Sequence, residues 1–116
     1  MDAKKIRERE LQIAKIKREL VALGDVRIGS LSQQYNVCGS PSCRCKASPP
    51  RRHGPYFQLS YTRKGKSTTR AIRRDNLRAL RIQLRNYAKL RDLVNRWIDL
   101  GTELSALKTP DRPGGR

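Results

Sequence analysis

The spacing of apolar residues near the N-terminus predicts an amphipathic helix over about residues 3–23. The apolar side chains fall into two rows of heptad spacing, Ile6, Ile13, Leu20 and Ile16, Leu23. Arg9 occupies the first place of the second row. Leu11, Ala14 and Val21 are expected to widen the apolar stripe. Such rows are typical of a helix that buries one stripe against another helix. Gly24 then favours the end of the helix.

The middle of the chain changes from helical spacing to alternation, which is typical of strands. The alternating apolar positions are Val26, Ile28, Tyr35 and Val37, with a bend expected at Gly29-Ser30. Tyr56–Thr62 is rich in strand-forming residues and Ser67–Ile72 is predicted to return beside it. Between them, residues 63–66 form a predicted turn in which Gly65 can adopt a positive φ.

A second helix is predicted over residues 75–107, with Asp75 as its N-cap. Its expected apolar row is Leu77, Leu80, Leu84, Tyr87, Leu90, Val94, Trp97, Gly101 and Leu104. A helix of this length spans roughly 50 Å, more than a small sheet can cover. The C-terminal half of this helix must therefore pack against an element other than the sheet. The two helices are expected either to pair antiparallel, with Trp97 in the seam, or to form a homodimer.

These patterns predict an α+β fold in four segments. They are an N-terminal helix (1–24), a basic antiparallel sheet of two to three strands braced by zinc (25–74), a long C-terminal helix that packs against the first (75–108), and a disordered Pro/Gly-rich tail (109–116). No apolar run approaches membrane-spanning length, and the charged N-terminus does not resemble a signal peptide. A cytoplasmic location is expected.

The distribution of charge along the chain indicates which class of molecule the protein binds. The net charge is +17, and residues 25–74 hold eleven basic side chains against one acidic, a net of +10. The flanking segments mix both signs, as solvated helices do. A basic block almost without acids indicates a polyanionic partner, either a nucleic acid or an anionic membrane, and we expect DNA or RNA.

The chain's three cysteines and its single histidine lie close together, in the order Cys38, Cys43, Cys45 and His53. Thiolates and imidazole are the ligands that Zn²⁺ prefers in a tetrahedral site. Residues 25–74 form a short, loop-rich segment whose basic side chains repel one another. A small apolar core alone would stabilise such a segment only marginally, and a bound metal would add to its stability. The spacing therefore predicts one structural zinc. Inert buried thiols are the alternative, and a redox or iron–sulfur role is a further one.

Catalysis is not expected. The four predicted ligands leave no open position on the metal, and no second histidine is available as a general base. A metal-dependent nuclease needs clustered carboxylates, but Asp25 is the only acid in the central block.

The motif around the cysteines resembles a family of small uncharacterised prokaryotic proteins, a domain of unknown function. The residues that carry the resemblance are Gly29-Ser30-Leu31, Tyr35, Cys38-Gly39, Cys43-Arg44-Cys45, His53-Gly54-Pro55-Tyr56, Leu59-Ser60-Tyr61 and Gly65-Lys66. It covers about residues 28–90, leaving the first helix and the tail outside. Members of that family have a helix after the hairpin and are often encoded near transposases. The resemblance thus implies the same fold and, by association, a mobile-element setting.

The expected function is that of a non-enzymatic, zinc-stabilised nucleic-acid-binding accessory protein of a mobile element or its regulation. The candidate binding residues are basic and lie in three places. Arg44, Lys46, Arg51 and Arg52 flank the cysteine loop, Arg63, Lys64 and Lys66 lie at the tip of the hairpin, and Arg70, Arg73 and Arg74 follow it. Tyr56, Phe57 and Tyr61 either stack on bases or face a core. The alternative function is a protein-interaction adaptor whose long helix docks a transposase, recombinase, nuclease or other partner. An exposed apolar stripe on the last helix, beyond Arg91, would favour this adaptor function.

Overall fold

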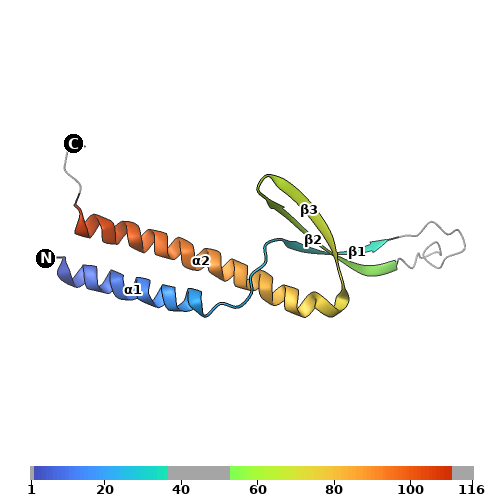
Figure 1. The fold of residues 1–116 in the computed structure, drawn as a ribbon, viewed down its shortest axis with the longest axis horizontal. Helices are drawn as coiled ribbons and strands as arrows, with labels where there is room; N and C mark the ends of the chain where they lie inside the picture. The colour runs from blue at the N-terminus through green and yellow to red at the C-terminus, as the bar shows by residue number, and fades with distance from the viewer. Residues whose placement is uncertain (1, 37–52, 111–116) are drawn as a thin grey trace, which may run out of the picture. The chain divides into compact units, whose positions relative to one another are not determined.

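The computed structural model describes residues 2–36 and 53–110, and it has the predicted α+β order of helix, sheet and helix (Figure 1). The elements are α1 (Ala3–Val21), β1 (Ser30–Asn36), β2 (His53–Arg63), β3 (Lys66–Ile72), a 3-10 turn η2 (Arg74–Asn76) and α2 (Leu77–Lys108). By its contacts the chain separates into a helical unit, residues 1–26 with 85–116, and a sheet unit, residues 27–84. Each unit is described by itself.

In the helical unit, α1 and α2 run antiparallel beside one another (Figure 1). Near the N-terminus of α1, Arg9 Nε donates to Glu103 Oε2 at 2.8 Å, and Lys108 Nζ donates to Glu10 Oε2 at 3.0 Å. At the other end, Asn86 Nδ2 donates to the backbone carbonyl that follows α1, at 2.8 Å. The expected pairing of the first and last helices is therefore confirmed within one chain.

The seam between the helices follows heptad rows on both sides. Its most buried residues are Ile13, Ile16 and Leu93. On α2 the row runs through Leu93, and not through Val94 as the sequence suggested. Leu93 is 1% exposed, whereas Val94 is 38% exposed. Both residues satisfy three-four spacing with their apolar neighbours, so periodicity could not choose between them. Packing against α1 selects the row that contains the larger leucine side chain.

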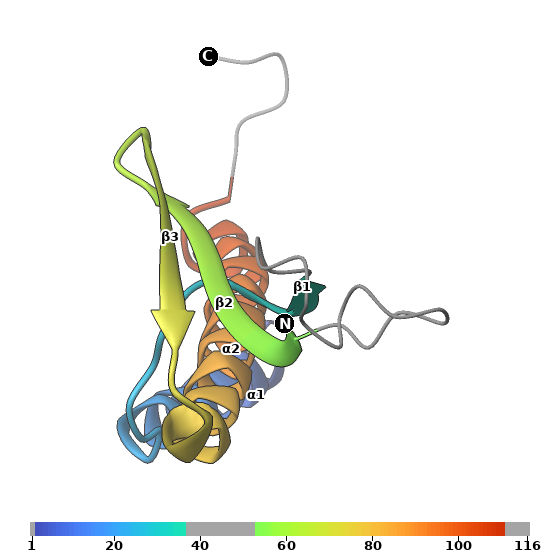
Figure 2. The ribbon, with the colours of Figure 1, turned by 90° about the vertical axis from the view of Figure 1, so that its right-hand side faces the viewer.

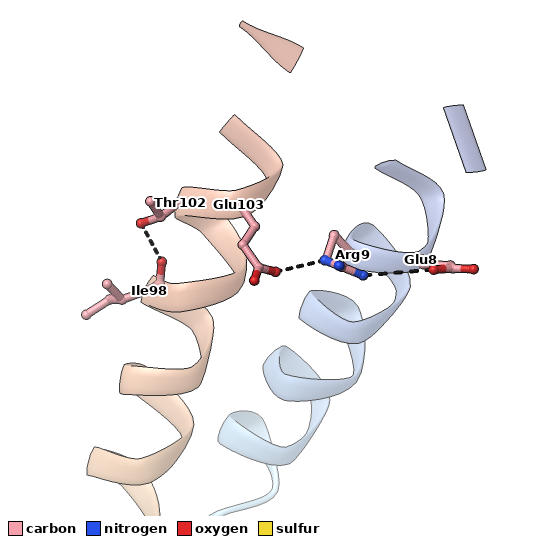
Figure 3. Close-up of polar contacts among 5 residues, drawn as sticks. All are labelled: Glu8, Arg9, Ile98, Thr102 and Glu103. Carbon is pink, nitrogen blue, oxygen red and sulfur yellow. Dashed lines mark hydrogen bonds and ion pairs between the residues drawn. The ribbon is translucent and has the colours of Figure 1, made fainter. Parts of the chain in front are cut away.

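The apolar stripe of α1 is narrower than predicted. Its heptad rows are buried or half-buried, but Leu11 is 60% exposed and Val21 is 86% exposed. Arg9, which interrupts the second row, keeps its place in the seam because Glu103 accepts its hydrogen bond (Figure 3). Its side chain is only 28% exposed, so this pair is partly shielded from water. The neighbouring Glu8 lies 3.9 Å from the same guanidinium, so two carboxylates offset the charge of Arg9, with the shorter contact made by Glu103 (Figure 3).

The sheet has the strand order β1-β2-β3, and both pairings are antiparallel. Lys64 and Gly65 link β2 to β3 with positive φ values of 53° and 75°. Two such residues make the type I′ turn whose twist matches a hairpin. The predicted turn is confirmed, although the positive φ of Lys64 was not foreseen. Because the first residue of β1, Ser30, pairs with Ser60, the hairpin continues past the start of β1 (Figure 2).

The buried side chains among the described residues of the sheet unit are two of β2, Phe57 and Leu59, and two of α2, Leu77 and Leu80. Leu59 is completely buried. Gly29 has a φ of 137°, and a Cβ there would lie 2.6 Å from Leu59 Cδ1. Glycine is therefore required at this position because of both its backbone angle and the close approach. The bend predicted at Gly29-Ser30 is not confirmed, since the chain has no bend or turn between residue 23 and the start of β1.

The predictions for the start of the second helix and for the starts of the strands are wrong, while those for the zinc loop and for most of the tail remain predictions. Asp75 lies inside the 3-10 turn that precedes α2, and is not the N-cap of a helix that starts at once. Val26 and Ile28 precede β1, which begins only after Gly29, while β2 begins earlier than predicted, at His53. Residues 37–52 and 111–116, which include the zinc loop and most of the predicted disordered tail, lie outside the described residues.

Neither helix in the described ranges combines the length and the apolar content that crossing a bilayer requires.

The seam register predicts different costs for two adjacent residues. Leu93→Ala should lower the free energy of unfolding by about 2–5 kcal/mol, because it leaves a cavity in a packed seam. Val94→Ala should cost less than about 1 kcal/mol, since its side chain is largely hydrated. Urea denaturation followed by circular dichroism measures both. A larger loss for Val94→Ala than for Leu93→Ala would show that the register is wrong.

Candidate nucleic-acid interface

The positive charge is concentrated in the sheet unit. Residues 27–84 hold thirteen basic side chains and one acidic side chain, Asp75, giving +12 of the total +17. Folding therefore gathers the central basic block and the first turns of α2 into one unit. A charge of this density raises the local concentration of polyanions and repels other cations.

The structure divides the predicted binding residues into two groups. Arg63, Lys64 and Lys66 lie at the tip of the β2–β3 hairpin, and all three are exposed. Arg73 and Arg74 lie at the opposite end of β3 and are exposed as well. A strand of this length separates the groups by about 20 Å. Arg70, within β3, stands between them. The remaining candidates, Arg44, Lys46, Arg51 and Arg52, lie outside the described residues.

The two faces of the sheet differ in charge. One face, called here the core face, carries the buried Phe57 and Leu59 of β2. Because side chains alternate along a strand and paired residues share a face, Arg63, Lys66 and Arg70 stand on this same face. Arg63 and Lys66 lie at the hairpin tip, whereas Arg70 lies on the outer strand β3 directly opposite the buried Leu59, and all three are exposed. The core face is therefore apolar along β2, with exposed cations at the hairpin tip and on β3.

The other face, called here the uncharged face, has no ionisable group apart from one phenol. It comprises Ser30, Ser32 and Gln34 of β1, Tyr56, Gln58, Ser60 and Thr62 of β2, and Ser67, Thr69 and Ala71 of β3. All are exposed except Gln58, which is half-buried. Two hydroxyl pairs bridge β2 and β3: Ser60 Oγ to Thr69 Oγ1 at 3.3 Å, and Thr62 Oγ1 to Ser67 Oγ at 2.9 Å. The strands are thus also linked by their side chains.

Tyr61 marks a local concentration of positive charge on the core face. Hydrogen bonding from Arg70, helped by the charges of Arg70 and Arg27, lowers the pKa of the Tyr61 hydroxyl below its ordinary value of 10.0. The backbone N–H of Arg27 donates to the Gln83 carbonyl of α2 at 3.2 Å, which ties the approach to β1 to the helix. Sequence analysis missed Arg27, because it precedes the strands and only folding brings it near β2.

The aromatic residues do not form a common stacking platform. Phe57 is 8% exposed and belongs to the core, with the Arg74 guanidinium carbon 6.0 Å from its ring centroid. Tyr56 is exposed on the uncharged face, and Tyr61 is half-buried on the core face. For Phe57 the interpretation as a core residue is therefore confirmed, whereas the two tyrosines face opposite directions.

The described part of the predicted metal site is its last ligand. His53 begins β2, and the sheet register pairs its backbone with Asn36, two residues before Cys38. The sheet thus brings together the two ends of the segment that holds Cys38, Cys43 and Cys45, which themselves lie outside the described residues. Among the residues that the structure does describe, no group of three or more metal-ligating side chains occurs.

A shallow apolar groove lies on the far half of α2, within the helical unit. Its lining residues are Val94, Trp97, Ile98, Gly101, Thr102, Ser105, Ala106 and Thr109. Ile98 is 58% exposed. The Thr102 hydroxyl donates to the Ile98 carbonyl at 2.8 Å, so it is satisfied by its own helix (Figure 3). Lys17 of α1 lies 5.2 Å from the centre of the Trp97 ring. Trp97 is therefore half-buried at the edge of the seam.

The chain belongs to the family described as Domain of unknown function (DUF6788), whose model matches residues 4–82. The match confirms membership of a domain-of-unknown-function family. It also corrects the expected extent, since α1 lies inside the family domain and residues 83–90 of α2 lie beyond it. No curated protein and no solved structure matches the chain.

Proposed function

We propose that this protein is a non-enzymatic accessory protein that binds nucleic acid through its sheet unit, in the service of a mobile element or its regulation. The observation that carries the proposal is the separation of charge within the fold. The sheet unit holds +12, and its exposed cations stand at the hairpin tip and at the start of α2. Phosphate groups spaced along a nucleic acid are the natural partner of such a surface.

The hairpin suits this role because its cations are held on a paired backbone. Arg63 and Lys66 are direct cross-strand partners next to a two-residue turn. Like charges directly opposite one another destabilise a sheet, and no acid in the described strands neutralises them. A bound phosphate would relieve that repulsion, so binding and hairpin stability are expected to support each other.

A structural zinc held by Cys38, Cys43, Cys45 and His53 is part of the proposal. Among the described residues of the sheet unit, four apolar side chains are buried, which is little for a unit of this charge. The pairing of Asn36 with His53 supports the site, because it brings one ligand near the start of the cysteine loop. The metal would fix that loop, and with it Arg44, Lys46, Arg51 and Arg52, beside the sheet.

The groove on α2 favours a second candidate function, a protein-interaction adaptor. It is the exposed apolar stripe beyond Arg91 that this function requires. Val94, Ile98, Gly101 and Ser105 follow the spacing of a helix–helix seam, and the small residues permit close approach. Lys17 lies near one end of the groove, over the Trp97 ring, and Lys108, which pairs with Glu10, lies near the other. The occupant that fits is an amphipathic helix with acidic flanks, from a transposase, recombinase or nuclease.

Nucleic-acid binding is predicted to depend steeply on salt. The logarithm of affinity should fall linearly with log salt, by about 0.9 per phosphate contact on duplex DNA. Arg63→Gln and Lys66→Gln should each reduce the slope by about 1. Fluorescence anisotropy over a salt series measures this. Arg7→Gln on α1 is the matched control, since it removes the same charge from an exposed site in the helical unit. A slope near zero, or hairpin variants that behave like the control, would contradict the proposal.

Metal analysis tests the zinc site. The folded protein should contain about one zinc per chain, and Cys43→Ser should release it, because a tetrahedral site loses a quarter of its ligands. Loss of the metal should weaken hydrogen-exchange protection in β1 and β2 while leaving the α1–α2 seam intact. Gln33→Ala, an exposed change in β1, should keep the metal. Folded protein without a transition metal would refute this part.

The adaptor function predicts a specific binding loss. After nuclease treatment, a protein partner should stay bound to the wild-type chain and be released by Ile98→Arg, since a cation in the groove cannot be desolvated. Leu11→Arg on α1, an equally exposed apolar residue, is the control. Pull-down followed by mass spectrometry identifies the partner, and native mass spectrometry reveals a second copy of the chain. Equal binding by the two variants would exclude the groove.

A further inference from the structure

We infer that the hairpin inserts into the major groove of B-form DNA with its uncharged face toward the base edges. This inference rests on the proposed nucleic-acid binding and deepens it. It assigns duplex DNA as the ligand and assigns base reading to Thr62 and Ser67 in the two-stranded part of the hairpin, together with Ser60 and Thr69 at the base of that part, none of which carries a charge.

The composition of this face sets it apart from an ordinary solvated surface. Because 32% of the chain is charged, the nine exposed positions of this face would carry about three charges if they followed the average. The uncharged face carries none, although it belongs to a unit of net charge +12. Hydroxyl and amide groups both donate and accept hydrogen bonds, and these are the groups that recognise base edges without being drawn toward phosphates.

The hairpin is narrow enough to enter the major groove of DNA. β1 starts at Ser30, opposite Ser60, so residues 61–68 form a ribbon of only two strands (Figure 2). Paired strands lie about 4.8 Å apart. The major groove of B-form DNA is about 12 Å wide and admits a two-stranded ribbon. The short serine and threonine side chains also let the backbone come close to the floor of the groove.

The opposite face supplies the phosphate contacts. The major groove is about 8.5 Å deep, so the phosphates that line it rise on both sides of an inserted ribbon. Arg63, Lys66 and Arg70 extend from the far face of the hairpin, and Lys64 lies at its tip. Long cationic side chains there can reach outward to the rims. Short polar groups toward the floor and long cations toward the rims together match a groove with uncharged bases and charged walls.

Other nucleic acids fit this arrangement less well. The major groove of duplex RNA is too deep and narrow for side chains to read. Single strands are held mainly by stacking on aromatic platforms. On the uncharged face the only aromatic residue is Tyr56, which lies at the end of β2 away from the hairpin tip. Duplex DNA is therefore the ligand that the two faces favour.

Selection of duplex DNA from a random pool by the full chain tests the inference. We expect an enriched sequence, bound in preference to scrambled duplex, to duplex RNA and to single strands of the same sequence. Thr62→Val and Thr69→Val keep the side-chain shape and strand propensity but remove a hydroxyl. Each should weaken binding to the enriched sequence about fivefold to tenfold while leaving affinity for scrambled duplex and the salt slope unchanged. Thr102→Val in α2 is the matched control and should bind as the wild type does.

The outcomes separate the inference from the proposed function. If Arg63→Gln lowers affinity on every probe but the threonine variants lose no sequence preference, nucleic-acid binding stands and base reading by this face is overturned. The same holds if Thr68→Val, on the core face, loses the preference instead, or if no sequence is enriched, or if RNA or single strands bind best. If neither the cation nor the threonine variants change binding, both claims fail.

Discussion

Burial of one face of β2 is the constraint on which the organisation of the sheet unit depends. Once Phe57 and Leu59 are buried with Leu77 and Leu80 of α2, the two-residue period of the strand assigns every other side chain to a face. A shift of one residue would place Gln58 and Ser60 in the core and expose the leucine. Gly29 enforces the same register from β1, since only a residue without a Cβ can pass so close to Leu59. The burial of two side chains thereby separates the cations from the uncharged residues across the whole hairpin.

The helical unit depends on a different kind of packing. Its seam consists of isoleucines and leucines at heptad positions, with one polar exception at Arg9 and Glu103. An ion pair of this kind contributes little net stability when exposed, but it fixes alignment, because a shifted register would leave the guanidinium among apolar neighbours. The pair formed by Glu10 and Lys108 supports the same alignment near the end of α2. The helices thus have a defined register and direction without a long apolar seam, and one side of α2 remains uncovered.

Charge and apolar surface consequently occupy different parts of the protein. The sheet unit concentrates cations and buries few apolar side chains among its described residues, whereas the helical unit has a more balanced charge and an apolar groove on α2. A nucleic-acid surface and a protein-docking surface impose opposite demands, since one needs hydrated cations and the other needs water to be expelled from apolar groups. If both proposed functions hold, separate units let each surface be built without weakening the other. This separation supports the proposal of an accessory protein that brings a protein partner to nucleic acid.

The sequence by itself determined the order and type of the elements. Heptad rows defined α1, alternating residues defined the hairpin, and the long apolar repeat after Asp75 defined α2, because these periods follow directly from helix and strand geometry. Only the tertiary structure decided which of two equivalent rows on α2 faces α1, burying Leu93 and leaving Val94 exposed. It also brought Arg27 near Tyr61 and assigned Arg70 and Thr69 to opposite faces. Those choices depend on packing and strand register between segments distant in the chain, and a local pattern carries no information about either.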